Sequence, residues 1–395
     1  MNTTNHPTAM FKETVDFIRS RYKAAQGQTV ALHSPVFAGN EKKYLNECID
    51  TTFVSSVGAF VDRFERDIAA YTGAAAAVVT ASGTAALHMA LLLSGVNRGD
   101  EVITQPLTFV ATCNALNLIG AEPVFVDVDT DTMGMSPAAL GQWLAENTTR
   151  KADGTIVNKT TGRRIAAVVP MHTFGHPVRI DDIADICTAF GIPLVEDAAE
   201  SIGSLYKGRH TGTFGRVGAI SFNGNKTITT GGGGMLLFND KELARKGKHL
   251  TTQAKVPHRW EFVHDSAAFN YRMPNINAAL GCAQLERIDT ILADKRATAA
   301  AYADFFSARP DSGIAFKAEP EGARSNYWLC AVQMPDRQTR DAFLEYTNDN
   351  GVMTRPVWEL MNRLPMWAHC QHGPLTNAEF LADTIVNIPS GVTPA

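Results

Sequence analysis

The feature that most constrains the fold is a regular alternation of short apolar runs with longer helical stretches between residues 76 and 238. The apolar runs are strand candidates and cover 76–80, 101–104, 123–126, 165–170, 193–195, 219–222 and 235–238. The stretches between them that read as helices cover 83–94, 111–119, 137–146 and 180–190. Short apolar runs separated by helices predict a mostly parallel, doubly wound sheet with helices on both faces.

The pattern changes beyond about residue 250. Residues 275–308 read as one long helix with a possible break, and 326–333, 339–348 and 352–356 indicate a smaller α+β unit. We therefore predict an α/β protein with a large domain over 1–250 and a small C-terminal domain over 251–395. The polar segment 151–164 is expected to be an exposed excursion between two strands.

Composition excludes several classes of function. The 395 residues are 45% hydrophobic with a net charge of −4, which suits a large buried core and gives no basic footprint for nucleic acid. The N-terminus has no apolar signal region, and no run is long enough to span a membrane, so we expect a cytoplasmic protein. Six scattered cysteines form no CxxC pair. His369-Cys370-Gln371-His372 is the only cluster of metal-ligand types, and we predict no metal site.

Lys226 has an unusual setting for a lysine. It lies between two apolar runs and is followed by four consecutive glycines, Gly231 to Gly234, that allow close approach of the backbone. It could be an ordinary loop lysine. A Walker phosphate loop is excluded, because Asn225 stands where that motif requires glycine. Asp197 ends another apolar run. A lysine and a carboxylate at strand ends are the pair that pyridoxal phosphate enzymes require: the amine forms a Schiff base and the acid keeps the pyridine nitrogen protonated.

The cofactor's phosphate would need an anion site after the first strand. Ser82, Gly83 and Thr84 open a helix there, where backbone N–H groups and the helix dipole favour an anion. A plain helix cap is the alternative for the same residues. Ser221, on the run that leads to Lys226, could add a hydroxyl. Phe109, just after the second strand, is either a stacking platform for a pyridine ring or a core residue.

Several segments in order form the pattern of a family. The chain resembles the DegT/StrS-type nucleotide-sugar aminotransferases from about residue 34 to residue 284. The matching segments are ASGTAAL (81–87), LTFVATCNA (107–115), VFVDVD (124–129), PMHTFGHP (170–177), PLVEDAAES (193–201), ISFNGNKTITTGGGG (220–234) and FNYRMPNINAALG (269–281). The resemblance implies PLP fold type I, the aspartate-aminotransferase-like fold, and a homodimer. It also implies that pyridoxal phosphate (PLP) cycles with pyridoxamine phosphate (PMP).

The resemblance also implies roles for particular residues. Lys226 looks like the Schiff-base lysine and general base, and Asp197 like the partner of the pyridinium nitrogen. Phe109 would stack on the ring, while Gly83, Thr84 and Ser221 would bind the phosphate, with Ser82 beside them.

Two further positions follow from the same likeness. Glu200 falls where the family usually has glutamine or histidine near the cofactor's phenol oxygen, so a carboxylate there would have to carry or share a proton. Asn270 would reach the cofactor phosphate of the neighbouring subunit, so that a complete site needs a dimer.

The resemblance also suggests which substrate the protein uses. Ser55, Ser56, Val57 and Gly58 are similar to the segment that contacts the nucleotide sugar in the family. The segments FNGNKTITTGGGG and PMHTFGHPVRID look most like the LegC-like branch. That branch implies amino transfer from L-glutamate to C4 of a UDP-linked 4-keto-6-deoxy-N-acetylhexosamine. Two alternatives stay open: a sugar dehydratase of the same fold, which Lys226 disfavours because those relatives carry histidine, and a non-catalytic sensor.

Overall fold

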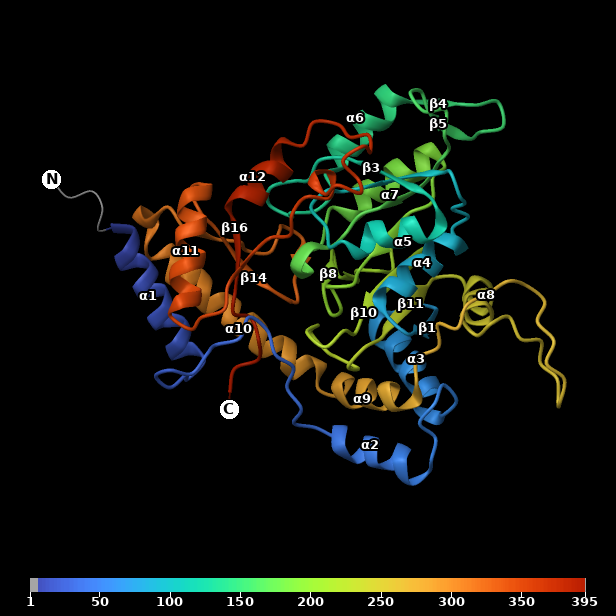
Figure 1. Ribbon diagram of the computed structural model, residues 1–395, viewed down its shortest axis with the longest axis horizontal. Helices are drawn as coiled ribbons and strands as arrows, with labels where there is room; N and C mark the ends of the chain where they lie inside the picture. The colour runs from blue at the N-terminus through green and yellow to red at the C-terminus, as the bar shows by residue number, and fades with distance from the viewer. Residues whose placement is uncertain (1–5, 395) are drawn as a thin grey trace.

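The computed structural model describes residues 6–394 and shows a central twisted sheet flanked by helices (Figure 1). One part of the sheet has the order β1 (Ala76–Thr80), β11 (Gly234–Phe238), β10 (Val217–Ser221) and β7 (Val195–Asp197). The other part has the order β3 (Glu122–Phe125), β2 (Glu101–Thr104) and β6 (Ile165–Val169). Parallel bridges from Val168 to Leu194 and from Met171 to Asp197 join the two parts into one seven-stranded sheet.

The strands are parallel except for β11, which runs antiparallel to both β1 and β10. Successive side chains of one strand enter different cores, because a strand places neighbouring residues on opposite faces. Leu236 packs in a core with α4 (Gly83–Leu93), α5 (Ala111–Ile119) and α8 (Lys241–Thr251), whereas Leu237 packs in a core with α3 (Ala59–Thr72) and α9 (Asn275–Leu285). The predicted doubly wound α/β sheet is confirmed.

The predicted strands and helices between 76 and 238 are all present, with ends displaced by at most two residues. The remaining helices of this region, α6 (Pro137–Asn147) and α7 (Ile180–Phe190), share a core beside β3 and β6. The polar excursion at 151–164 contains half of a small hairpin, in which β4 (Thr148–Arg150) pairs with β5 (Ile156–Asn158). It projects from one end of the molecule in Figure 1.

The C-terminal part contains a small antiparallel sheet. Its order is β12 (Ala315–Phe316), β14 (Cys330–Gln333), β16 (Ile385–Ile388) and β15 (Arg355–Pro356), and helices α10 (Ile288–Ser307), α11 (Arg337–Asp349) and α12 (Thr376–Thr384) accompany it. The long helix predicted over 275–308 is interrupted between α9 and α10. Its break lies at Glu286 and Arg287.

The first helix packs against residues that are far from it in the sequence. In α1 (His6–Arg21), the ring of Phe11 meets Phe343 of α11 edge-on at a centroid distance of 5.2 Å. This helix therefore belongs to the core of the C-terminal part, although it lies within the stretch 1–250 predicted as the large domain. The boundary near residue 250 stays a prediction, and we propose that α1 be grouped with the small domain.

One further helix is α2 (Glu41–Asp50). The remaining elements are short: the strands β8 (Leu205–Tyr206), β9 (Arg209–His210) and β13 (Ala323–Arg324), and the 3₁₀ turns η1 (Thr173–Gly175), η2 (Pro310–Ser312) and η3 (Met361–Arg363). Within residues 6–394, no helix combines the length and apolar character needed to cross a membrane.

Candidate active site

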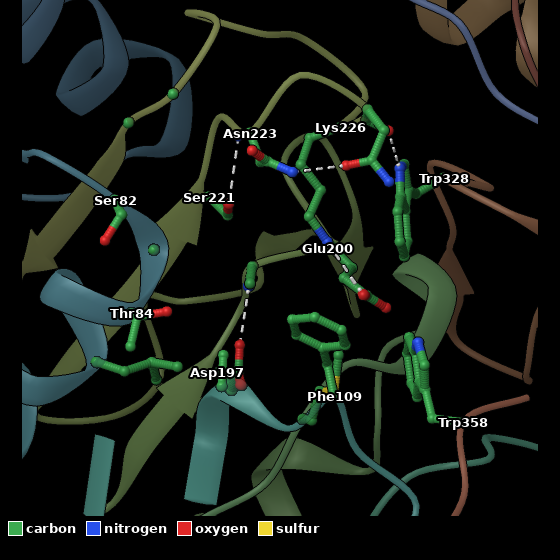
Figure 2. Close-up of a pocket in the computed structure, with 18 residues that line it drawn as sticks. Ser82, Thr84, Phe109, Asp197, Glu200, Ser221, Asn223, Lys226, Trp328 and Trp358 are labelled. Carbon is green, nitrogen blue, oxygen red and sulfur yellow. Dashed lines mark hydrogen bonds and ion pairs between the residues drawn. The ribbon is translucent and has the colours of Figure 1, made fainter. Parts of the chain in front are cut away.

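A cavity of about 260 Å³ opens where β1, β7 and β10 end and where β11 begins. Ligands of open α/β sheets bind at this edge, beyond the carboxyl ends of the parallel strands. Two tryptophans from the C-terminal part complete the wall (Figure 2). The predicted residues that line the cavity are Ser82, Gly83, Thr84, Phe109, Asp197, Glu200, Ser221 and Lys226.

Lys226 is held inside this cavity. Its side chain is 11% exposed, and its Nζ donates to Glu200 Oε1 at 3.1 Å. The same Nζ lies 3.7 Å from the centroid of the Trp328 ring, which favours a cation over its face. Trp328 in turn donates from Nε1 to the carbonyl of Asn225, fixing the turn that carries the lysine. Lys226 therefore lies in a loop, but its amine is held by protein groups rather than by solvent.

Asp197 is the last residue of β7 and is buried. Thr112 Oγ1 donates to its Oδ2 at 2.7 Å, and the Ala199 amide donates to Oδ1 at 3.1 Å. Burial raises the pKa of Asp197, although these hydrogen bonds and the charge of Lys226 oppose the rise. A cationic group in the cavity would stabilise the carboxylate, which fits the partner of a protonated pyridine nitrogen.

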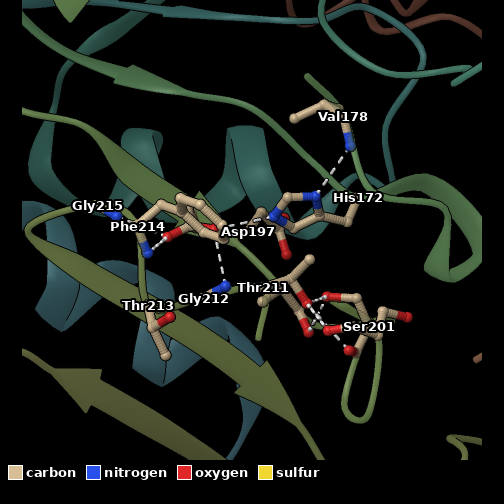
Figure 3. Close-up of polar contacts among 12 residues, drawn as sticks. His172, Val178, Asp197, Ser201, Thr211, Gly212, Thr213, Phe214 and Gly215 are labelled. Carbon is tan, nitrogen blue, oxygen red and sulfur yellow. Dashed lines mark hydrogen bonds and ion pairs between the residues drawn. The ribbon is translucent and has the colours of Figure 1, made fainter. Parts of the chain in front are cut away.

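Glu196, the neighbour of Asp197, is held in place by several hydrogen bonds. Its carboxylate accepts the amides of Gly212, Phe214 and Gly215 at 2.6–2.7 Å and pairs with His172 Nε2 at 3.1 Å. Figure 3 labels these four partner residues. Burial acts to raise the pKa of Glu196, but His172 and these amides outweigh it and leave the pKa lowered. This ionised carboxylate holds the turn at 211–215 against β7 and so helps to position Asp197.

Glu200 faces Lys226 from the loop after β7. Its Oε2 accepts the amide of Phe174 at 2.9 Å, while Oε1 accepts from Lys226. Burial raises the pKa of Glu200 to about 7, against the opposing charge of Lys226. The carboxyl group can therefore hold or release a proton near neutral pH, which agrees with the expectation that an acid at this position carries or shares a proton.

The anion end of the cavity lies at the N-terminus of α4. Ser82 caps this helix by accepting the Ala85 amide at 3.1 Å, so the plain cap is correct for its side chain. The N–H groups of Gly83 and Thr84 belong to the first turn of α4, where no helix carbonyl is available to accept them. They are therefore directed out of the N-terminal end of the helix. A Cβ on Gly83 would lie 2.8 Å from the Cβ of Ser221, so glycine is what allows α4 to approach β10. Both features fit a phosphate.

Phe109 is not a core residue. Its side chain is 47% exposed, and its ring meets Trp358 edge-on with the centroids 6.0 Å apart. Figure 2 shows the ring between Asp197 and Trp358, where an aromatic face is available to a planar ligand. The core alternative is therefore wrong, and stacking on a cofactor ring stays a prediction.

The other predicted site residues do not line the cavity of their own chain. Asn270 accepts a hydrogen bond from Arg272 at 2.9 Å. Ser55 and Ser56, in the loop between α2 and α3, are also outside it; the Ser55 carbonyl accepts the amide of Asn275 at 2.6 Å. Val57 in the same loop is 70% exposed.

Gly58 allows a close approach, but the group it approaches belongs to the protein. A Cβ on Gly58 would lie 2.2 Å from Cγ of Asn275, so this glycine lets the loop pack on α9. The proposed contacts of Asn270 and of residues 55–58 with ligands would therefore need a second chain.

Sequence reasoning missed the aromatic wall and one hydrogen-bond donor. Trp328 and Trp358 come from the C-terminal part, and no spacing in the sequence relates them to Lys226. Thr112 could have been found, because it lies only three residues after Phe109 in the segment LTFVATCNA, in the first turn of α5.

Together the sheet and the cavity define a class. An aspartate at a strand end and a lysine in the loop between β10 and β11, with a helix N-terminus beside them, are the parts of a pyridoxal-phosphate-dependent enzyme of fold type I. The chain belongs to the DegT/DnrJ/EryC1/StrS aminotransferase family, whose model matches residues 36–393. It is a PLP-dependent nucleotide-sugar aminotransferase, as the sequence predicted.

Similar proteins support this placement over nearly the whole chain. A GDP-perosamine synthase of Escherichia coli O157:H7 is 36% identical over 91% of this chain and 93% of its own. A GDP-perosamine synthase of Vibrio cholerae is 36% identical over 91% and 94%. Among solved structures, the aminotransferase TlmJ from Streptoalloteichus hindustanus superposes with a TM-score of 0.82 at 30% identity, covering 92% of this chain and 93% of that one.

Proposed function

We propose that this aminotransferase moves the amino group of L-glutamate to C4 of a nucleotide-linked 4-keto-6-deoxy sugar. The observation that carries the proposal is the position of Lys226, whose amine faces Glu200 in the cavity that also contains Asp197 and the N-terminus of α4. The relatives named as GDP-perosamine synthases support a sugar nucleotide as the acceptor.

The bound cofactor supplies an electron sink and carries the amino group between donor and acceptor. In the proposed mechanism Lys226 would hold the cofactor and would carry a proton on its Nζ. Asp197 would keep the pyridine nitrogen protonated, and Phe109 would support the ring. The amides of Gly83 and Thr84, with the hydroxyl of Ser221, would bind the phosphate.

Glu200 is suited to exchange a proton with its surroundings. As a carboxylate it accepts from Lys226, and as an acid it can donate to an oxygen of the cofactor. Because burial brings the pKa of Glu200 to about 7, both forms are available near neutral pH.

Two observations favour different nucleotides in the sugar substrate. The likeness of residues 170–181 and 222–234 to the LegC-like branch favours a UDP-linked 4-keto-6-deoxy-N-acetylhexosamine. Relatives with 36% identity over 91% of the chain are named for a GDP-linked sugar. We place the GDP-linked keto sugar first, because that likeness extends over nearly the whole chain rather than over two segments.

A homodimer is part of the proposal. Four large apolar side chains in and beside the loop 51–58 are exposed: Ile49, Phe53, Val54 and Val57. Trp260 and Phe262, in the projecting loop that leads to Asn270, are 68% and 79% exposed. Burial of these surfaces between two chains would bring Asn270 and residues 55–58 to the partner's cavity.

The decisive experiment is a single turnover of pyridoxamine-phosphate-loaded protein with a panel of GDP-, UDP- and dTDP-linked 4-keto-6-deoxy sugars. We expect an amino sugar from one nucleotide series, and 2-oxoglutarate when glutamate regenerates the loaded form. Equal turnover of pyruvate or oxaloacetate would refute the sugar assignment. Loss of the sugar's hydroxyl without amino transfer would indicate the dehydratase, and no reaction with any acceptor would indicate the sensor.

A further inference from the structure

Three side chains of different chemistry meet at the N-terminal end of the edge strand β3, whereas the active-site cavity lies beyond the C-terminal ends of the parallel strands. Glu122 begins β3, and His369 and Cys370 lie in the loop between η3 and α12. Glu122 Oε2 is 3.2 Å from His369 Nε2 and 3.6 Å from Cys370 Sγ, and the sulfur is 3.8 Å from the same nitrogen. The sequence prediction of no metal rests on spacing, which cannot reveal this group because Glu122 and His369 are 247 positions apart.

These separations match the edges of a tetrahedral zinc site. With Zn–O and Zn–N bonds of about 2.1 Å and a Zn–S bond of about 2.3 Å, tetrahedral geometry places oxygen and nitrogen about 3.4 Å apart and sulfur about 3.6 Å from either. The three atoms therefore occupy three corners of such a tetrahedron. Because the His369 side chain is 65% exposed, the fourth corner is accessible to water.

A second carboxylate lies on the neighbouring strand. Glu101 of β2 is the register partner of Glu122 in β3, so negative charge gathers at this end of the sheet. A bound divalent cation would replace the thiol proton of Cys370, since a coordinating thiol is deprotonated.

The position gives such a metal a structural role. The loop that carries His369 and Cys370 forms an edge along β3: the Phe125 amide donates to the Gln371 carbonyl, and the Gly373 amide donates to the Phe125 carbonyl, both at 3.0 Å. We propose that Glu122, His369 and Cys370 bind one Zn²⁺ that fastens this loop to the edge of the sheet. The metal displaces one proton from the thiol and takes water as its fourth ligand.

The test uses tag-free, chelator-treated holoenzyme titrated with Zn²⁺ alone and with Co²⁺ alone. His372→Ala is the matched control, because it removes a neighbouring imidazole whose Nδ1 pairs with the Gly373 carbonyl instead. We expect wild type and His372→Ala to bind one Zn²⁺ per chain, and His369→Ala and Cys370→Ser to bind at least about tenfold more weakly.

Two further readouts keep the result independent of activity. Zn²⁺ should raise the midpoint of thermal unfolding of wild type but not of His369→Ala, and the Co²⁺ form should show a thiolate charge-transfer band that Cys370→Ser lacks. If Cys370→Ser does not fold, His369→Ala still decides, because its side chain is largely exposed. Equal Zn²⁺ affinity in wild type and His369→Ala would overturn the proposal.

Discussion

At the scale of single residues, the negative charge of Asp197 gives the most specific prediction about activity. Asp197→Asn keeps the shape that accepts from Thr112 but removes the negative charge, so the amide cannot hold a pyridinium proton. We expect amino transfer to fall by on the order of a hundredfold while weak cofactor binding remains. Thr112→Val is the control, because it removes one hydrogen bond and leaves the charge. If steady-state kinetics show Asp197→Asn within about threefold of wild type, Asp197 has no part in the mechanism.

Glu200 is the residue with the clearest dependence on pH. Its pKa rises from an ordinary value of 4.5 to about 7 in the folded, cofactor-free chain. A raised folded-state pKa contributes stability that is fully present below pH 4.5 and is lost as pH rises toward 7. Replacing the group by Glu200→Gln removes this dependence. The variant's free energy of unfolding, relative to wild type, should therefore increase from pH 4.5 to pH 7 by on the order of 3 kcal/mol and then level off.

Urea unfolding of the cofactor-free proteins at fixed concentration, across that pH range, measures the difference. A difference that does not change with pH would mean that Glu200 titrates as it does in the unfolded chain.

At the scale of elements, the contact between α4 and β10 sets the phosphate end of the cavity. In Gly83→Ala the new Cβ meets Ser221 at 2.8 Å, so the helix must move and its amides leave the phosphate position. We expect a loss of stability of about 1–3 kcal/mol and weaker cofactor binding. Gly232→Ala is the matched control, because it lines the same cavity and its Cβ would have no neighbour within 4 Å. Equal cofactor affinity in the two variants, measured by titration of the apo forms, would contradict this role.

Elements also show why prediction succeeded where it did. The apolar runs of β1, β6 and β10 are visible because both faces of these strands are buried, so every residue must be small or apolar. Strand ends then locate Asp197 and Lys226. The direction of a strand cannot be predicted from burial in the same way. All five residues of β11 are buried, as are those of β10, yet β11 runs antiparallel because the Gly-rich loop after Lys226 connects the two strands directly. The position of Trp328 could not be predicted, because only tertiary packing brings this residue to the cavity.

At the scale of the whole molecule, the proposed dimer can be tested by complementation. Lys226→Ala and Asn270→Ala chains, each inactive alone, should regain part of the activity when subunits exchange, because one site of the hybrid then has both residues intact. Hybrids identified by native mass spectrometry report the outcome. Hybrids that stay inactive, although Asn270→Ala homodimers are impaired, would show that Asn270 acts within its own chain.

The central claim is that Lys226 is the residue to which the cofactor is bound. Borohydride reduction of the purified protein, followed by peptide mass spectrometry, tests it most directly, because reduction makes the link permanent. We predict that the mass of the reduced cofactor is found on the peptide containing Lys226 and that Lys226→Ala carries none. Cofactor mass on another lysine, or none on the wild-type protein when PLP is bound, would contradict the assignment of this cavity as the active site.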